Sequence, residues 1–190
     1  MIDILDHSEL ITDNSFILFL DFYEAFDSIE HKFMFKALDI FGFGNMFKKT
    51  LYAGANSSIK LPYGTTIRFD FNHGICQGCP ISPCLFLLPM QLLSIHFKSS
   101  DVLGLLFAED CLLLNLKLIQ LFFLKDKSQV GKAIKVINTF SMASGLKLNI
   151  SKCELLPVKS CTDTIISGVP VKHKVEYIGV IIEKDQISSI

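Results

Sequence analysis

The chain has 190 residues, half of them apolar, with 18 lysines and arginines, 19 acidic residues and a formal net charge of −1. This length fits one domain, and the apolar content excludes an intrinsically disordered chain, which combines low hydrophobicity with high net charge. The near-zero net charge, taken alone, argues against a free-standing nucleic-acid binder, which usually carries a basic excess. Arg68 is the only arginine of the chain.

The two ends of the chain differ in charge. Residues 1–47 hold nine acids and two lysines, whereas residues 117–174 hold ten lysines and three acids. This split fits either an acidic centre that faces a basic surface or ordinary solvated surface. We expect an intracellular protein, cytoplasmic or nuclear, because the N-terminus lacks the pattern of a signal peptide and no stretch suits a membrane span.

The six cysteines are therefore expected to be reduced thiols. Cys76 and Cys79 have the spacing of a zinc knuckle, but no second pair follows, and a structural zinc site needs four ligands.

The first half of the chain predicts a strand, two helices and a hairpin. Residues 16–22, FILFLDF, predict a buried strand, near whose end Asp21 is unexpected unless it binds something. Residues 30–41 show apolar side chains at helical spacing, and residues 46–52 predict another helix. Residues 58–71 predict a hairpin around Pro62-Tyr63-Gly64.

The second half predicts two long helices and several strands. A turn-rich loop at 74–80 leads into a helix that runs to about Lys98, with Ser82 as the expected N-cap. Strands at 103–107 and 111–116 flank Glu109 and Asp110. A helix at 127–144, closed by Gly145, precedes strands at 146–150 and 175–182. The order predicts an α+β fold with helices on one face of the sheet.

Three carboxylates stand out from this layout. If the strands are neighbours in one sheet, Asp21, Glu109 and Asp110 converge at one sheet edge. Converging carboxylates need a cation to stay ionised together, and oxygen ligands favour Mg²⁺ or Mn²⁺. Two such ions, about 3.5–4 Å apart, would stabilise the attacking and leaving oxygens of a phosphoryl transfer. From spacing alone, a polar hairpin tip is the simpler interpretation of Glu109 and Asp110.

Five segments add a more specific signal. The segments are LDFYEAFD (20–27), GICQGCPISPCLF (74–86), FAED (107–110), SGLKLNISKCE (144–154) and YIG (177–179). In this order they resemble motifs A, B, C and D and the primer-grip motif of reverse transcriptases. The closest variety is the non-LTR, LINE-type retrotransposon polymerase. The resemblance assigns the CxxC cysteines to motif B.

The resemblance implies a polymerase palm, with a ferredoxin-like, split βαβ antiparallel sheet and helices on one face. It implies a palm at 1–160, and a primer-grip region with the start of a missing thumb at 161–190. Asp21, Glu109 and Asp110 match the catalytic metal ligands for Mg²⁺ or Mn²⁺. The implied partners are an RNA template, a DNA primer and deoxynucleotide triphosphates.

The same motifs imply further site residues. Those matching nucleotide- or primer-binding positions are Phe22, Phe26, Gln77, Gly78, Tyr177 and Gly179. Phe26 matches the aromatic gate against a ribose 2′-hydroxyl, and core packing explains it as well. Lys152 matches the motif D lysine, a candidate catalytic proton donor to pyrophosphate, with an ordinary solvated lysine as the alternative.

The chain departs from the family pattern in three ways. Glu109 stands where the family has Asp, which moves the carboxylate by roughly 1.5 Å, and a misplacement of about 1 Å can cost 10²-fold in rate. The segment between Lys98 and Phe107 is shorter than usual. The fingers, thumb and endonuclease regions of the parent element are expected to be largely missing, because only twenty residues precede Asp21 and thirteen follow Tyr177.

We therefore expect a reverse transcriptase domain that is weakly active or inactive. One alternative is a non-catalytic retrotransposon remnant, such as a pseudogene product or an RNA- or protein-binding domain. Another is an unrelated Mg²⁺-dependent phosphotransferase, but this alternative does not explain the sequence of motif B.

Overall fold

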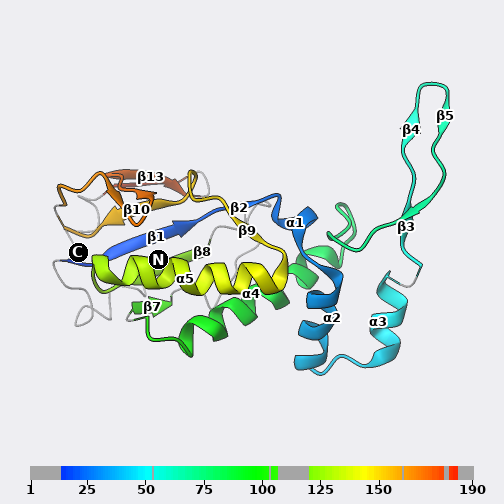
Figure 1. Cartoon of the computed structure of the whole chain (residues 1–190), viewed down its shortest axis with the longest axis horizontal. Helices are drawn as coiled ribbons and strands as arrows, with labels where there is room; N and C mark the ends of the chain where they lie inside the picture. Colours follow the sequence, from blue (N-terminus) through cyan, green and yellow to red (C-terminus); the bar gives the residue numbers. More distant parts are fainter. Residues whose placement is uncertain are drawn as a thin grey trace.

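A four-stranded antiparallel sheet forms the centre of the molecule. The computed structural model describes residues 14–52, 54–102, 104–106, 120–159, 161–177 and 180–183. Strand β1 (Phe16–Leu20) lies between β10 (Glu154–Pro157) and β8 (Gln120–Leu124), and β7 (Gly104–Leu106) pairs with the other edge of β8. The mixture of helices and antiparallel strands confirms the α+β class (Figure 1).

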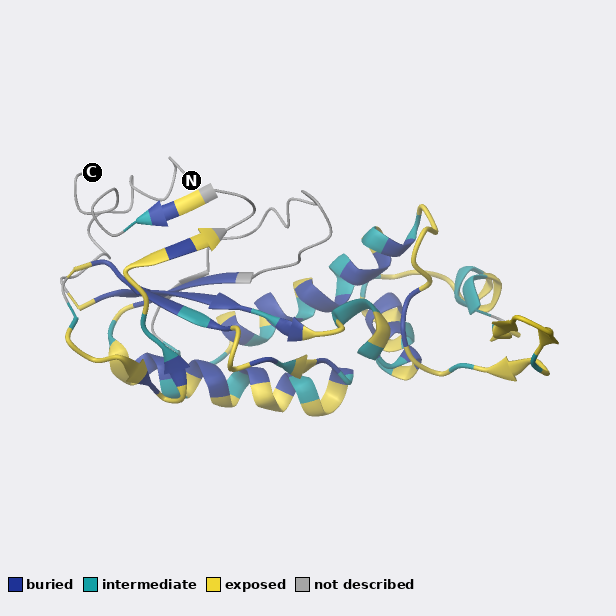
Figure 2. Cartoon of the chain, turned by 90° about the horizontal axis from the view of Figure 1, so that it is seen from above, coloured by how far each residue is buried: buried dark blue, intermediate teal, exposed yellow. Residues whose placement is uncertain are grey.

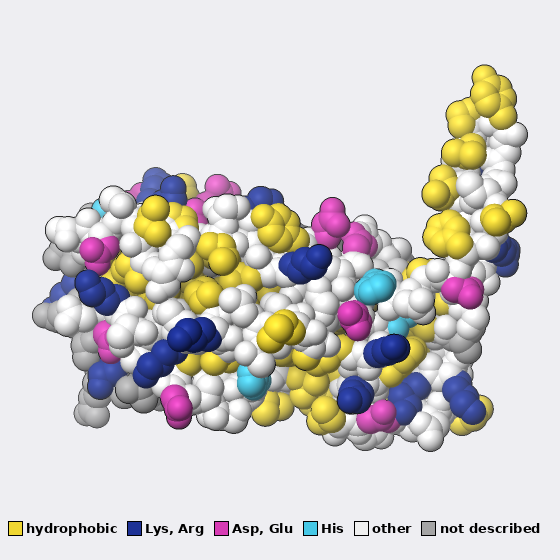
Figure 3. Space-filling view, in the orientation of Figure 1, with side chains coloured by type: hydrophobic (Ala, Val, Ile, Leu, Met, Phe, Trp, Pro, Cys, Tyr) yellow, Lys and Arg dark blue, Asp and Glu magenta, His cyan; other side chains and the backbone are white. Residues whose placement is uncertain are grey.

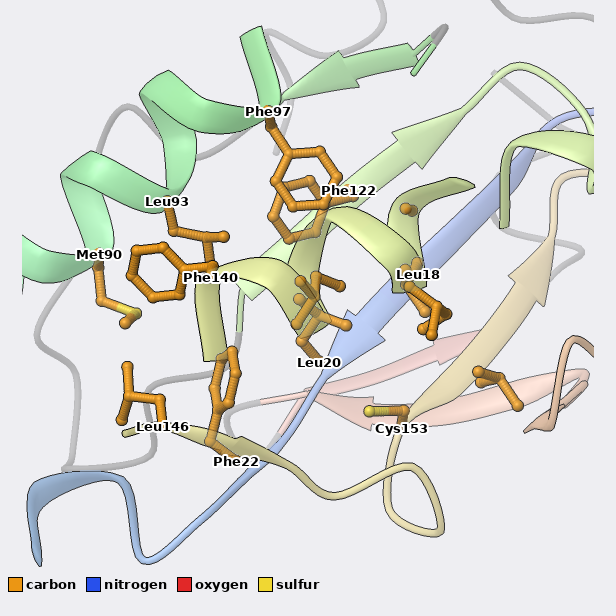
Figure 4. Packing of buried hydrophobic residues seen from close by; sticks show 14 of the residues in the cluster. Leu18, Leu20, Phe22, Met90, Leu93, Phe97, Phe122, Phe140, Leu146 and Cys153 are labelled. Atoms are coloured by element: carbon orange, nitrogen blue, oxygen red, sulfur yellow. The ribbon is translucent and has the colours of Figure 1, made fainter. Parts of the chain in front are cut away.

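All five residues of β1 are buried, because both faces of the sheet are covered (Figure 2). Phe16, Leu18 and Leu20 belong to the core on the helix side, where Figure 4 shows Leu18 and Leu20 with Leu93 and Phe140. Ile17 and Phe19 belong to a second cluster, which Val175 and Ile182 cover from the opposite side. A strand covered on both faces needs a continuous apolar run, and FILFL supplies one.

Helices α2 (His31–Ile40), α4 (Ser82–Lys98) and α5 (Lys127–Ser144) build the helix-side core, together with the shorter α1 (Ala25–Ser28) and α3 (Asn45–Tyr52). The predicted helix at 127–144 is confirmed as α5, and Val130, Ala133, Ile134 and Ile137 form its buried apolar face. The Asp126 side chain caps α5 by accepting a hydrogen bond from the Ser128 amide at 2.7 Å. Gly145 ends the helix in the left-handed conformation, with φ 81°.

The expected N-cap of α4 was wrong by one residue. Ile81 occupies the cap position with helical dihedral angles, and Ser82 is the first helical residue. The reason is the preceding turn, in which the Ser82 amide donates to the Cys79 carbonyl at 3.1 Å and continues into the helix. The Ser82 hydroxyl donates to the Cys76 carbonyl at 2.6 Å, so it fastens the preceding loop to α4.

Two strand predictions also need correction. The run at 175–182 is a hairpin of β13 (Lys174–Tyr177) and β14 (Val180–Glu183), because it reverses and pairs Val175 with Ile182 on the sheet side. The run at 16–22 is broken at Asp21, after which β2 (Phe22–Tyr23) pairs with β9 (Lys147–Leu148).

The strand that pairs with β7 is β8, which sequence analysis did not predict, while the expected strand at 111–116 lies outside the described residues. Strand β10 and the short pair β11 (Ile165–Ile166) and β12 (Val169–Pro170) were not predicted either.

The predicted hairpin at 58–71 is confirmed and projects away from the rest of the molecule (Figures 1 and 3). Strand β3 (Asn56–Ser57) pairs with β6 (Phe69–Asp70), and β4 (Lys60–Leu61) pairs with β5 (Gly64–Thr65). Its large exposed apolar side chains are Ile59, Leu61, Tyr63, Ile67 and Phe69. In the described part of the chain, no helix has the length and apolar character needed to cross a membrane.

Candidate active site

Asp21 lies between β1 and β2, where the backbone leaves the central sheet. Its carbonyl accepts a hydrogen bond from the Asn149 amide at 2.8 Å, and its amide donates to the Cys153 sulfur at 3.5 Å. Both partners come from the segment that resembles motif D, more than 120 residues further along the chain. The Asp21 residue is partly exposed. Motif D therefore holds the backbone of Asp21 on both sides and leaves its carboxylate at the end of β1.

Cys153 is the residue behind this arrangement, and sequence analysis gave it no role. It is fully buried in the helix-side core (Figure 4). Burial raises the pKa of the Cys153 thiol to about 11, the hydrogen bond from the Asp21 amide lowers it, and the Asp21 charge raises it again. The thiol therefore stays protonated at neutral pH and serves as a packing and hydrogen-bonding group. No feature of the sequence pairs it with Asp21.

The register of the sheet shows at which end β7 stops and β8 starts. Leu20, which precedes Asp21, pairs with Gln120 at the start of β8. Leu106, the last residue of β7, pairs with Phe122. Strand β7 therefore ends, and β8 begins, at the end of the sheet where Asp21 lies, and residues 107–119 form the connection between them.

Glu109 and Asp110 belong to that connection and lie outside the described residues. Within the described ranges, no three His, Cys, Asp or Glu side chains are close enough to hold a metal ion together.

The loop that resembles motif B packs against the segment that resembles motif A. The Ile75 amide donates to the Phe26 carbonyl at 2.7 Å, and the Gly74 amide donates to the Ile29 carbonyl at 2.8 Å. A Cβ at Gly74 would lie 3.1 Å from the Asp27 carbonyl oxygen, and the φ of 86° at Gly74 is also one that glycine favours. This close backbone contact explains the glycine that begins the motif.

Phe26 and Gln77 lie on the two sides of this contact. The Phe26 ring is partly exposed and stacks on Phe86 of α4, with ring centroids 4.8 Å apart. The Gln77 side-chain amide lies 3.3 and 3.4 Å from the two carboxylate oxygens of Asp27 and donates to them. Core packing of Phe26 is therefore present, and part of the ring remains free to contact a ligand.

The other predicted site residues are distributed around this centre. Phe22 is buried in the helix-side core (Figure 4), so most of its ring is not available to a ligand. Lys152 is exposed in a turn, where its amide donates a hydrogen bond to the Asn149 carbonyl at 3.0 Å. The backbone of Tyr177 ends β13, beyond the helix-free face of the sheet, and Gly179 lies outside the described residues.

A second group that sequence analysis missed surrounds His31, the first residue of α2. Its buried ring lies with Nε2 2.7 Å from the Gly74 carbonyl oxygen. Phe35, Tyr52 and Phe71 pack around it, with ring centroids 4.7–6.1 Å from that of His31. A cavity of about 650 Å³ opens beside these rings. His31 therefore anchors the start of the motif B loop through the Gly74 carbonyl.

Comparison with protein families matches residues 2–182 to the family described as reverse transcriptase (RNA-dependent DNA polymerase). Among curated proteins, the chain is 30% identical over 155 residues to the transposon TX1 uncharacterized 149 kDa protein of Xenopus laevis, covering 74% of this chain and 12% of that protein.

The chain is also 29% identical over 169 residues to the retrovirus-related Pol polyprotein from type-2 retrotransposable element R2DM of Drosophila melanogaster, covering 82% of this chain and 15% of that protein. Both relatives are thus several times longer than this chain. Among solved structures, an apo telomerase from Candida tropicalis, truncated from the C-terminal domain, is similar with a TM-score of 0.66 and 17% identity. That match covers 95% of this chain and 36% of the telomerase chain, and it supports the fold alone.

Proposed function

Because the chain belongs to the reverse transcriptase family, with relatives among LINE-type retrotransposon proteins, we propose that it is the palm of an RNA-templated DNA polymerase. The observation that supports the proposal is the sheet register, in which β7 ends and β8 begins at the end of the sheet where Asp21 lies. In this proposal residues 1–160 form the palm, and residues 161–190 form the primer-grip region and the start of a thumb.

The proposed cofactor is Mg²⁺ or Mn²⁺, held by Asp21, Glu109 and Asp110. The Asp21 carboxylate suits this role because it is partly exposed, makes no ion pair with a described residue, and its backbone is fixed by Asn149 and Cys153. Carboxylate oxygens are the ligands that hard divalent ions prefer. When bound, the ions would supply charge stabilisation for nucleotidyl transfer.

The proposed substrates are a deoxynucleotide triphosphate, a DNA primer and an RNA template. Phe26 would limit the space beside the sugar, because its ring is fixed against Phe86. Gln77 and Gly78 would face the incoming nucleotide from the loop of motif B, and Lys152 would supply a proton to pyrophosphate. Phe22 would support the site from the core, while Tyr177 and Gly179 would hold the primer end.

We expect the isolated chain to be weakly active or inactive. Glu109 carries the correct charge one methylene too far out, and a misplacement of about 1 Å can cost 10²-fold in rate. The test is extension of a DNA primer on an RNA template with Mg²⁺ or Mn²⁺. We expect Glu109→Asp to raise the rate by about 10²-fold, and Asp21→Ala in that background to abolish the gain.

Two results would count against this proposal in different ways. If the unmodified chain extends the primer rapidly and Asp21→Ala abolishes this activity, Glu109 does not impair the site. If Glu109→Asp does not raise the extension rate and Asp21→Ala leaves RNA binding unchanged, the non-catalytic remnant is favoured.

A further inference from the structure

Two thiols flank the residues at the tip of the motif B loop. Cys76 and Cys79 are both exposed and free. The Cys79 amide lies 3.4 Å from the Cys76 carbonyl oxygen, and Gly78 between them has a φ of 84°. A backbone hydrogen bond from the amide of the fourth residue to the carbonyl of the first, with glycine at positive φ in the third position, is the pattern of a type II β-turn. The two cysteines are therefore the first and fourth residues of one turn.

The turn brings the two cysteines within bonding range. A β-turn keeps its first and fourth Cα atoms closer than about 7 Å, and disulfides join cysteines whose Cα atoms lie about 4.4–6.8 Å apart. Tyr52 lies near both cysteines. Burial raises the pKa of its hydroxyl, a hydrogen bond from the Cys76 backbone lowers it, and negative charge on the Cys76 and Cys79 thiolates raises it.

We propose that Cys76 and Cys79 form a redox modification site, at which a small-molecule disulfide oxidises the two thiols to an intramolecular disulfide. One cysteine thiolate attacks the small disulfide, forms a mixed disulfide and releases one small thiol. The other cysteine then attacks the protein-bound sulfur of the mixed disulfide, closes the Cys76–Cys79 bond and releases the second small thiol. The two cysteine protons leave with the two released thiols, and the small disulfide is reduced by two electrons.

The other described cysteines differ from this pair. Cys84 is exposed in the first turn of α4, and Cys161 is partly buried. Cys153 is buried, and its raised pKa of about 11 leaves little thiolate to react. Only Cys76 and Cys79, among the described cysteines, are both exposed and joined by a turn hydrogen bond.

The disulfide would fix the residues that it encloses. Gln77 and Gly78 lie between the two sulfurs, and the Gln77 side chain donates to Asp27. A covalent link across the turn would restrict the loop to this conformation, and reduction would release it. This proposal does not depend on polymerase activity, because the chemistry is confined to the two thiols.

The test equilibrates the reduced whole chain with mixtures of reduced and oxidised glutathione, followed by acid quenching and peptide mapping without reduction. We expect the unmodified chain and the matched control Cys84→Ser to lose two hydrogen atoms in mass and to yield a Cys76–Cys79 cross-linked peptide. Cys76→Ser should instead retain glutathione on Cys79, because no second thiol resolves the mixed disulfide.

Gly78→Ala tests the turn itself. An alanine at φ 84° is strained, although nothing lies within 4 Å of its Cβ, so the ratio of cross-link to glutathione adduct should fall about tenfold. Gly44→Ala, with equally open space and no positive φ, should leave the ratio unchanged. Stable glutathione adducts on both Cys76 and Cys79 of the unmodified chain, or a preferred cross-link from either to another cysteine, would overturn the proposal.

Discussion

Gly145 joins the end of α5 to the segment that follows motif A, and its replacement by alanine measures how tightly these parts meet. The residue has a φ of 81°, and an added Cβ would lie 2.6 Å from the Ser28 carbonyl oxygen and 2.9 Å from the Glu30 Cγ. The neighbouring Glu30 amide donates to the Ser144 carbonyl at 2.9 Å. The Ser28 oxygen is part of the backbone, so it cannot move aside without displacing the segment between α1 and α2.

Two costs add in Gly145→Ala. The left-handed conformation costs a non-glycine residue roughly 1–2 kcal/mol, and forcing an extra methyl group into a packed site typically costs about 1–3 kcal/mol. We therefore expect the free energy of unfolding to fall by about 2–5 kcal/mol. Urea unfolding followed by circular dichroism, with the slope compared between variants, measures this loss.

Two glycines of the same chain separate these costs. Gly42 has a φ of 79° with nothing within 4 Å of an added Cβ, so Gly42→Ala should show the conformational cost alone. Gly44 has open space and no positive φ, so Gly44→Ala should show neither of these two costs. If Gly145→Ala costs no more than Gly42→Ala, the close contact between α5 and the segment after motif A is wrong.

Three further predictions concern stability. The pKa of Cys153 is raised to about 11 from an ordinary 9.0, because burial favours the neutral thiol. The free energy of unfolding should therefore be unaffected below pH 9 and should fall by up to about 3 kcal/mol as the pH rises from 9 towards 11. Cys153→Ala should not show this loss when unfolding is measured across the alkaline range. The prediction fails if the variant and the unmodified chain lose stability equally between pH 9 and 11. Asp126→Ala should cost about 1 kcal/mol by removing the cap of α5, and Asp126→Asn, which can still accept the Ser128 bond, is its control in thermal unfolding. Replacing residues 58–67 by a short glycine linker should change the unfolding free energy by less than about 0.5 kcal/mol and reduce self-association measured by light scattering, because the hairpin is exposed and rich in apolar side chains. A large loss of stability would mean that the hairpin packs on the body.

The parts of the fold that sequence analysis predicted are those with a long local pattern. Helices α2 and α5 repeat apolar side chains at helical spacing, α4 is a long apolar segment that begins with Ser82-Pro83, and β1 is an unbroken apolar run, so these elements follow from local order. Strands β10 to β12, which were not predicted, have two to four residues each. Such short strands exist because a distant segment supplies hydrogen bonds, and no local pattern encodes that partner.

The candidate site shows the same division. Resemblance to family motifs singled out Asp21, Phe26 and Gln77, and the segments of motifs A and B pack together, with Gln77 donating to Asp27. The groups that support the site were missed, since Cys153 contacts a residue 132 positions away and His31 contacts one 43 positions away. A buried cysteine or histidine resembles any other core residue until its partner is known.

The position of β1 between β8 and β10 sets the order in which the molecule can fold. Residues 16–20 are synthesised before their partner strands, which begin at residues 120 and 154. Closing such long loops is entropically costly before the pairing is rewarded, so non-local sheets form slowly. Until then FILFL is an unpaired apolar segment that can associate with other chains. Strand β1 is thus made before both of its partners, and the yield of folded protein depends on whether this segment avoids association until they are available.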